Sequence, residues 1–557
     1  MTNNRVTARL SAATKGNDPR TSTKRHQKQF VLVRVISWIV VYVGLCSNWS
    51  LRTFITAVFC FLLALNGGLN LNSPARNIGA QTAPGSQTQS QTRESPSVTE
   101  RIKRVENGLL PPFVIKGQPS VQMKLADRMK FYSTPGISIA VIDKGRIEWA
   151  RGYGVRETGG SEAVTPETLF QAASISKPVA AVAALRLVQP GKLDIDEDVN
   201  RKLNSWKLPE NEFTSAKKVT LRGLLSHSAG LTVHGFAGYA SDTTAPTLLQ
   251  VLDGVTPANS KAIRVDVAPG TKYRYAGGGY EVLQQLLMDV TGKQFPLFMQ
   301  ATVLKRIGMT HSSYEQPLPK QRWSQAAIGH RSNGEKVKGN WHTYPEMAAA
   351  GLWTTPEDLA RFAIEIQRSL AGKSNRVLSQ KMARQMLAAQ VGGWGLGFGL
   401  PGKGPSARFN HGGANEGYRC LLVAYKSTGQ GAVVMTNSDS GSSLADEVLR
   451  SIAREYGWVD YLPEEKVLAR VDPKIYSSYV GQYELAPNFI LNITAEKDRL
   501  FGQATGQPKL ELFPESETRF FPTAAAVEIT FVKDEKGQVT HLILRQGGQD
   551  ITAKKIK

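Results

Sequence analysis

The chain has 557 residues, of which 41% are hydrophobic, so it is long enough for more than one domain and can bury a substantial core. Its formal net charge is +22, but residues 1–80 carry ten Lys or Arg against one Asp, and acidic residues are interspersed with basic ones in the remainder. Because the sequence has no dense basic stripe with interleaved aromatic residues, we expect no nucleic-acid partner.

Cysteine and histidine usage argues against metal chemistry. Residues 81–557 contain one cysteine, Cys420, which excludes an intrachain disulfide and a cysteine metal cluster there. The eight histidines of the chain show no zinc-type spacing. Metal-dependent hydrolysis is therefore a poor interpretation, and we expect no metal site.

Residues 1–72 resemble a targeting or anchor region. A basic, polar stretch (residues 1–29) precedes an apolar run over 30–46 and a second apolar run over 54–65. The second run has the length of a signal-peptide core and is shorter than the roughly 20 residues of a transmembrane helix. We expect export to the periplasm or the medium, with cleavage or with an N-terminal membrane anchor. A hairpin of two spans, which would return the chain to the cytoplasm, stays open.

Residues 73–110 are predicted to be a disordered linker, because the stretch up to about residue 100 is rich in Gln, Ser, Thr and Pro and poor in apolar residues. The segment from 111 to 460 then alternates strand-like and helix-like pieces. Residues 136–150 and 420–436 each have the pattern of a β-hairpin, and we expect the two hairpins to be neighbours in one sheet. The fold class is α/β (α+β), with an antiparallel sheet flanked by helices and a helical lobe.

A candidate nucleophile lies at the start of one predicted helix. Ser174 and Lys177 are three residues apart and share a helix face, so the lysine amine can reach the serine hydroxyl. Pro178 is tolerated only in the first turn of a helix, which places Ser174 at the helix N-terminus, where free N–H groups favour an oxyanion. Burial of this apolar helix would lower the pKa of Lys177 and favour its neutral form.

Four further segments follow in a definite order along the chain. Residues 224–231 read Leu-Leu-Ser-His-Ser-Ala-Gly-Leu, and residues 269–280 combine a Pro-Gly turn, a short strand and a glycine run. Residues 350–359 read Ala-Gly-Leu-Trp-Thr-Thr-Pro-Glu-Asp-Leu, and residues 410–417 read Asn-His-Gly-Gly-Ala-Asn-Glu-Gly. Together with Ser174 and Lys177, these segments resemble the serine β-lactamase and penicillin-binding superfamily, in its class C-like branch, over about residues 115–455.

The resemblance implies a β-lactamase/transpeptidase-like fold and a serine hydrolase that forms an acyl-enzyme without a cofactor. It implies that Ser174 is the nucleophile, Lys177 its base, and Tyr275 a further base whose phenolate is favoured by the lysine cation. His411, with Gly412 and Gly413, matches the family's Lys-Thr-Gly strand. The backbone N–H groups of Ser174 and Ala414 would form the oxyanion hole. The substrate would be bound by Gly277, Gly412, Gly413 and Asn415.

The chain departs from the family where a β-lactam would be recognised. Gly277 replaces the asparagine of the Tyr-x-Asn element, and Gly412 removes the hydroxyl of the Lys-Thr-Gly strand. His411 would be charged only part of the time near neutral pH. We therefore expect an esterase or a D-amino-acid peptidase rather than an efficient β-lactamase. Space at Gly277 for a bulkier acyl group is a hypothesis.

The expected partner is a small-molecule or peptide substrate, with the cell wall as one source, and the oligomeric state stays open. The alternative function is a non-hydrolytic, penicillin-binding-like protein that holds a cell-wall peptide or another partner in the same cleft. Retention of Ser174, Lys177 and Tyr275 favours an enzyme, because a binding protein needs none of them.

Residues 472–557 have a different character. Short strand-like pieces over 489–494, 509–513, 527–532 and 542–544 are separated by turns, which predicts a small antiparallel barrel or sandwich. By its position after the hydrolase-like segment, it resembles the lipocalin-like domain that is appended to serine hydrolases of this branch.

Overall fold

The computed structural model describes residues 97–119, 121–546 and 549–557. The predicted targeting region (residues 1–72) and most of the predicted linker lie outside this range. Among the described helices, none combines the length and the apolar character that crossing a membrane requires.

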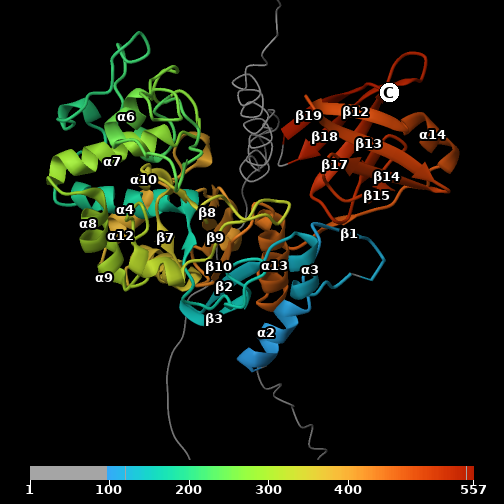
Figure 1. The fold of residues 1–557 in the computed structure, drawn as a ribbon, viewed down its shortest axis with the longest axis horizontal. Helices are drawn as coiled ribbons and strands as arrows, with labels where there is room; N and C mark the ends of the chain where they lie inside the picture. Colours follow the sequence, from blue (N-terminus) through green and yellow to red (C-terminus); the bar gives the residue numbers. More distant parts are fainter. Residues whose placement is uncertain (1–96, 120, 547–548) are drawn as a thin grey trace, which may run out of the picture. The chain divides into compact units, whose positions relative to one another are not determined.

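The centre of the domain that precedes the C-terminal strands is an antiparallel five-stranded sheet in the order β3-β2-β10-β9-β8 (Figure 1). Its strands are β2 (Gly136–Asp143), β3 (Arg146–Gly154), β8 (Arg408–Asn415), β9 (Tyr418–Tyr425) and β10 (Gly431–Thr436). The two predicted hairpins are β2–β3 and β9–β10, and β10 pairs directly with β2. The predicted sheet neighbours are thereby confirmed.

Both faces of this sheet are buried, and the alternation of side chains along β2 shows why. Ile137, Ile139 and Val141 pack on one face, in a core with α13 (Gly441–Glu455), while Ala140 and Ile142 pack on the other. Since successive strand residues point to opposite faces, a run of apolar residues suits a strand that is covered on both sides. α11 (Pro356–Leu370) covers the second face.

The structure corrects one part of the linker prediction. Residues 98–106, which the sequence places in a disordered segment, form the helix α2 (Val98–Glu106). Ile102 and Val105 are buried in the core shared with α13, and the polar residues of α2 face away from it. The few apolar residues in this polar stretch have a helical spacing, and docking on α13 stabilises the helix.

The remaining helices of the domain form the helical lobe and the edge of the sheet. They are α3 (Leu125–Phe131), α4 (Ser176–Val188), α5 (Leu221–Leu225), α6 (Leu248–Asp253), α7 (Gly278–Thr291), α8 (Phe295–Met299), α9 (Lys305–Ile307), α10 (Met347–Ala350) and α12 (Gln380–Met386). Short strand pairs link β4 (Phe170–Gln171) with β7 (Trp353–Thr354), and β5 (Tyr239–Ala240) with β6 (His342–Thr343).

The C-terminal strands close into an eight-stranded antiparallel barrel, which confirms the predicted β-domain. They are β12 (Gly481–Ala486), β13 (Phe489–Glu496), β14 (Arg499–Ala504), β15 (Leu510–Pro514), β16 (Arg519–Phe521), β17 (Val527–Lys533), β18 (Val539–Gln546) and β19 (Gln549–Lys555). Tyr479, on α14 (Tyr476–Tyr479), stacks on Phe531 in the barrel core with ring centroids 4.2 Å apart. Before the barrel, β11 (Glu464–Lys466) pairs in parallel with β1 (Phe113–Ile115).

Candidate active site

Ser174 lies in a tight turn directly before α4. The turn is a 3₁₀-helix, Ala173–Ile175, in which Ala173 adopts a left-handed φ of 50°. A non-glycine residue in this region is strained, and such strain is concentrated at functional sites. Lys177 lies in the first turn of α4, and its Nζ donates a hydrogen bond of 2.9 Å to Ser174 Oγ. The predicted serine–lysine pair is therefore in direct contact.

Lys177 is poised between its charged and its neutral form. Its side chain is buried, and Nζ also donates to the carbonyl oxygen of Ala349 at 2.8 Å. Burial lowers the pKa of Lys177 to about 7, with the negative charge of Glu281 acting in the opposite direction. The neutral amine can donate to Ala349 and accept the Ser174 proton at the same time.

Tyr275 lies beside this pair, with Lys177 Nζ 5.1 Å from the centre of its ring. Burial raises the pKa of Tyr275, and a hydrogen bond with Ser174 opposes the rise without cancelling it. The phenol form is therefore favoured near neutral pH. This differs from the phenolate that the resemblance implies, because the tyrosine is enclosed and the adjacent lysine is itself largely uncharged above its pKa.

Aromatic rings enclose Tyr275 on several sides. His227 lies 4.1 Å from it, His234 4.9 Å and Trp394 6.2 Å, measured between ring centroids. Trp394 also contacts His411 at 5.7 Å. The sequence did not single out Trp394 as a site residue. The signal that could have found it is its position in the glycine-rich run 392–399, where a large ring is flanked by residues without side chains.

β8 runs alongside the nucleophile turn because Gly413 has no side chain. A Cβ at this position would lie 2.2 Å from the carbonyl oxygen of Ala172 and 2.4 Å from Sγ of Cys420. Only glycine allows this approach, which places Ala414 on the strand next to the turn of Ser174. The arrangement can supply two backbone N–H groups to an oxyanion.

Asn415 ends β8, and its amide is engaged by the protein. Its Nδ2 donates to Oε1 of Gln171 at 2.8 Å and to the carbonyl oxygen of Ala350 at 3.1 Å. These bonds tie β8 to β4 and to α10. Asn415 therefore holds together the strands and the helix that surround the site.

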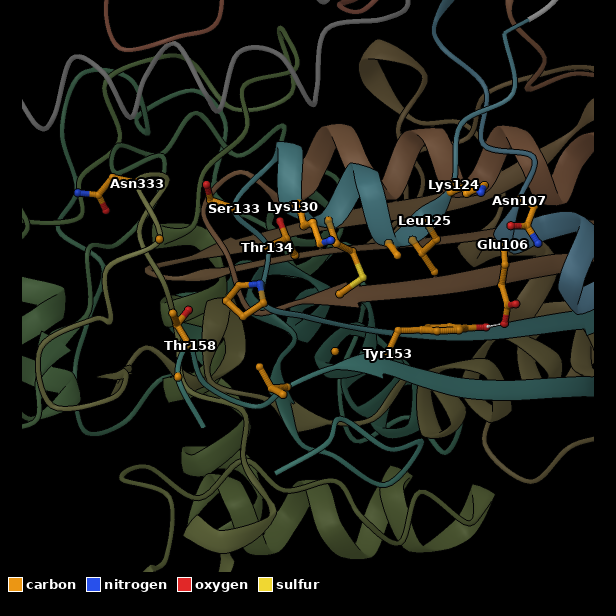
Figure 2. Close-up of a pocket in the computed structure, with 17 residues that line it drawn as sticks. Glu106, Asn107, Lys124, Leu125, Lys130, Ser133, Thr134, Tyr153, Thr158 and Asn333 are labelled. Carbon is orange, nitrogen blue, oxygen red and sulfur yellow. Dashed lines mark hydrogen bonds between the residues drawn. The ribbon is translucent and has the colours of Figure 1, made fainter. Parts of the chain in front are cut away.

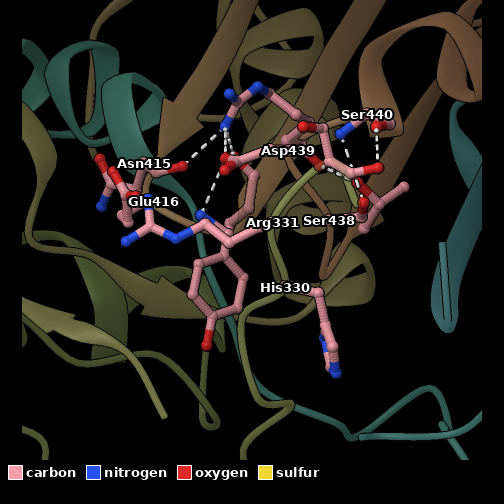
Figure 3. Close-up of polar contacts among 12 residues, drawn as sticks. His330, Arg331, Asn415, Glu416, Ser438, Asp439 and Ser440 are labelled. Atoms are coloured by element: carbon pink, nitrogen blue, oxygen red, sulfur yellow. Dashed lines mark hydrogen bonds and ion pairs between the residues drawn. The ribbon is translucent and has the colours of Figure 1, made fainter. Parts of the chain in front are cut away.

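The turn that follows β8 is fixed by two ion pairs (Figure 3). Arg331 pairs with Glu416, and Arg419 pairs with Asp439 at 2.9 Å. Arg419 Nη1 also donates to the carbonyl oxygen of Asn415 at 2.7 Å. These contacts hold the end of β8 at a defined position, which a preorganised oxyanion site requires.

His411 is fully buried on β8, and its Nδ1 lies 2.7 Å from the carbonyl oxygen of Gly412. Burial, assisted by the charge of Lys177, lowers the pKa of His411 to about 3. The imidazole is therefore neutral at physiological pH. This differs from the partial charge that its ordinary pKa predicts. The position at which the family's Lys-Thr-Gly strand has its lysine therefore carries no positive charge in this protein.

Gly277 precedes α7, and the space beside it is filled. A Cβ at this position would lie 3.1 Å from Cε2 of Phe236 and 3.1 Å from the carbonyl oxygen of His234. The backbone N–H of Gly277 donates to that same carbonyl at 3.0 Å. The structure thus shows no open space at Gly277 for a larger acyl group.

A hollow of about 930 Å³ lies elsewhere in the domain (Figure 2). Its wall includes Leu125, Met129 and Tyr153. The Tyr153 hydroxyl donates to Glu106 at 2.8 Å (Figure 2). None of the predicted site residues lines it. Within the described residues, no group of three or more His, Cys, Asp or Glu side chains is placed to hold a metal ion.

Comparison with known proteins gives two family matches. The model of the family described as Beta-lactamase matches residues 121–455, and that of a domain of unknown function (DUF3471) matches residues 465–555. Penicillin-binding protein 4* of Bacillus subtilis (strain 168) is 24% identical over 448 residues, which cover 76% of this chain and 95% of that protein. Protein flp of Staphylococcus aureus (strain N315) is 26% identical over 282 residues, covering 47% of this chain and 52% of flp.

Among solved structures, the octameric penicillin-binding protein homologue from Pyrococcus abyssi has a similar fold. It has a TM-score of 0.52 and 22% sequence identity, and the match covers 77% of this chain and 98% of that one. At this identity the likeness supports the fold alone. The fold class that the sequence predicts is confirmed.

Proposed function

Since the chain belongs to the β-lactamase family, we propose that it is a serine hydrolase that cleaves an ester or amide bond through an acyl-enzyme at Ser174. The observation that carries this proposal is the 2.9 Å contact between Ser174 Oγ and the Lys177 amine, in a site where burial lowers the pKa of the lysine to about 7. A nucleophile and a base matched to neutral pH are what acyl transfer requires.

In the first step, the neutral amine of Lys177 takes the proton of the Ser174 hydroxyl. Ser174 Oγ forms a bond to the substrate's carbonyl carbon, and the carbonyl oxygen gains the negative charge. The N–H groups of Ser174 and Ala414 stabilise this oxyanion. When the bond to the leaving oxygen or nitrogen breaks, that atom receives the proton from Lys177 by way of the Tyr275 hydroxyl. Water then repeats the sequence on the acyl-enzyme and releases the acid.

The substrate class that we propose is an ester or a D-amino-acid peptide rather than a β-lactam. A neutral His411 and the missing hydroxyl at Gly412 give a β-lactam carboxylate neither a cation nor a hydroxyl donor at these positions. The name of penicillin-binding protein 4* of Bacillus subtilis nevertheless makes acylation by penicillin a reaction that should be measured.

The test is labelling with a fluorophosphonate probe, followed by a panel of p-nitrophenyl esters, nitrocefin and D-Ala-D-Ala peptides. We expect the wild type to be labelled and Ser174→Ala not to be labelled. We also expect esters or peptides to be turned over faster than nitrocefin. Absence of Ser174-dependent labelling would contradict the proposal. Labelling without turnover of any substrate would favour the alternative, a penicillin-binding-like protein that holds its partner without hydrolysis.

We further propose that the protein is exported and acts on a substrate derived from the cell wall. The support for export is the basic and apolar character of residues 1–72, which lie outside the described part of the chain. Fractionation of cells that produce the full chain, with detection of the mature N-terminus, would distinguish cleavage from anchoring. Recovery in the cytoplasmic fraction would contradict export.

A further inference from the structure

A buried histidine with an unusual backbone conformation lies beside Tyr275. α5 ends at Leu225, and His227, two residues further on, has a left-handed φ of 57°. Its side chain is 2% exposed. Residues other than glycine rarely adopt this conformation, although histidine and asparagine adopt it more readily than most. A strained and buried polar residue next to a catalytic site needs an explanation.

His227 holds the residue before Tyr275 and the residue after it. The carbonyl oxygen of His227 accepts a hydrogen bond from the N–H of Arg274 at 2.8 Å. Its ring nitrogen Nδ1 accepts a second one from the N–H of Ala276 at 3.2 Å. A single residue therefore fixes the backbone on both sides of Tyr275.

The ring of His227 also packs on the ring of Tyr275. The two ring centroids are 4.1 Å apart, and the ring planes are inclined by 32°. On its other side, the Tyr275 hydroxyl is hydrogen-bonded with Ser174. Because packed interiors leave little free space, this contact blocks a shift of the tyrosine ring away from Ser174 and toward His227.

The hydrogen bond from Ala276 requires the neutral form of His227. Because Nδ1 accepts, the proton of the neutral imidazole lies on Nε2, which has no hydrogen-bond partner among the described residues. Burial lowers the pKa of His227 well below its usual value, and the positive charge of Lys177 lowers it further. The ring is therefore neutral at physiological pH, and Nδ1 stays an acceptor.

We propose that His227 is a positioning residue that holds the Tyr275 hydroxyl where it delivers the proton to the leaving group, by accepting the N–H of Ala276 at Nδ1 and by packing on the tyrosine ring. The inference rests on the proposed function, because it assigns His227 to the same reaction. The proton comes from Ser174 and passes by way of Lys177 and Tyr275 to the leaving atom. His227 neither gives nor takes a proton.

Two substitutions separate the acceptor of His227 from the rest of its side chain. His227→Ala removes the acceptor and the ring together. In His227→Asn, Oδ1 takes the place of Nδ1, and asparagine also tolerates the left-handed φ. Alkyl esters have a poor leaving group that depends on the proton from Tyr275, whereas p-nitrophenyl esters do not. We expect His227→Ala to lower kcat/KM about tenfold more for alkyl esters than for p-nitrophenyl esters, and His227→Asn to recover most of that difference.

The experiment measures kcat/KM for both classes of ester in the full chain, for the wild type and for the two variants. Each variant is also combined with Tyr275→Phe, because a residue that acts through Tyr275 has nothing left to position when the hydroxyl is gone. In that background, His227→Ala should no longer change the ratio between the two ester classes. The proposal is overturned if His227→Ala leaves the ratio unchanged, if it changes the ratio equally in both backgrounds, or if His227→Asn recovers nothing.

The matched control is His330→Ala, the same change at another buried histidine whose ring accepts a backbone hydrogen bond. Nε2 of His330 accepts from the N–H of Thr158 at 3.0 Å, and its side chain is 0% exposed. Loss of this histidine should change kcat/KM by the same factor for both classes of ester. A fall in the ratio as large as that in His227→Ala would assign the effect to lost packing and overturn the proposal.

Crystal structures of the two variants give a readout that does not depend on activity. The Tyr275 hydroxyl should be displaced from Ser174 in His227→Ala and should keep its place in His227→Asn. A tyrosine that keeps its wild-type position in His227→Ala overturns the proposal. If the wild type is not labelled by a fluorophosphonate, the proposed function fails and so does a role in acyl transfer, while these structures still decide whether His227 holds Tyr275. If Tyr275→Phe changes the ester ratio and His227→Ala does not, this inference alone fails.

Discussion

Substitution of Gly413 by alanine tests whether the approach of β8 to the nucleophile turn is needed for catalysis. The new Cβ would lie 2.2 Å from the carbonyl oxygen of Ala172, and real Cβ contacts are essentially never shorter than 3.0 Å. Because the contact is with backbone, β8 has to move away by about 1 Å, which misplaces the N–H of Ala414. We expect acylation to slow about 100-fold. We also expect the folded state to be destabilised by about 1–3 kcal/mol.

The assay is the rate constant of fluorophosphonate labelling at a pH where this rate no longer depends on pH, together with the Tm of thermal unfolding. Gly279→Ala is the matched control, because a Cβ on this α7 residue would meet its nearest neighbour, Leu231 Cδ1, at an ordinary 3.5 Å. It should label at the wild-type rate. A folded Gly413→Ala protein that is acylated as fast as the wild type would refute the reasoning that β8 supplies part of the oxyanion site.

Three other predictions concern Lys177 and Tyr275. Lys177→Met removes the base while keeping the volume of the side chain, so the rate constant of labelling should fall by at least about 100-fold. The Tm should not fall, since a buried amine no longer has to be desolvated. Unchanged labelling would exclude the lysine as the base. In the wild type, the rate constant of labelling should fall about tenfold per pH unit below about pH 7 and level off above it, because the ammonium cannot accept the Ser174 proton. If the rate instead begins to fall near the ordinary pKa of lysine, the argument that burial lowers this pKa is contradicted. Tyr275→Phe should lower kcat/KM more for alkyl esters than for p-nitrophenyl esters, because a poor leaving group depends on the proton that the hydroxyl delivers; equal losses would contradict that role.

The features that the sequence predicts well are those set by local chemistry. The Lys144-Gly145 turn, both residues with positive φ, joins β2 to β3 as the hairpin pattern indicates. Pro178 fixes the start of α4, so Ser174 and Lys177 meet as their spacing predicts. The short strands after residue 472 form for the same reason, since their alternation and turns are local signals. Their closure into a barrel rather than a sandwich depends on the pairing of β12 with β19, which the sequence left open.

The features that the sequence did not reveal depend on contacts between distant segments. Glu281 and Glu346 are both fully buried, and the packing of α10 against α7, which lie far apart in the sequence, contributes to this burial. Trp394 reaches His411 across the fold. The neutral state of His411 follows from complete burial, which spacing alone does not predict. In each case the chemistry is set by tertiary burial.

The most direct test of the central claim is the mass of the acyl-enzyme. After the wild-type protein has reacted with a fluorophosphonate, peptide mapping by mass spectrometry should place the added mass on Ser174 alone, and Ser174→Ala should gain none. The same peptide should carry the acyl group of a slowly hydrolysed p-nitrophenyl ester after rapid acid quenching. An adduct on another residue, or no adduct in a folded wild-type protein, would contradict the assignment of Ser174 as the nucleophile.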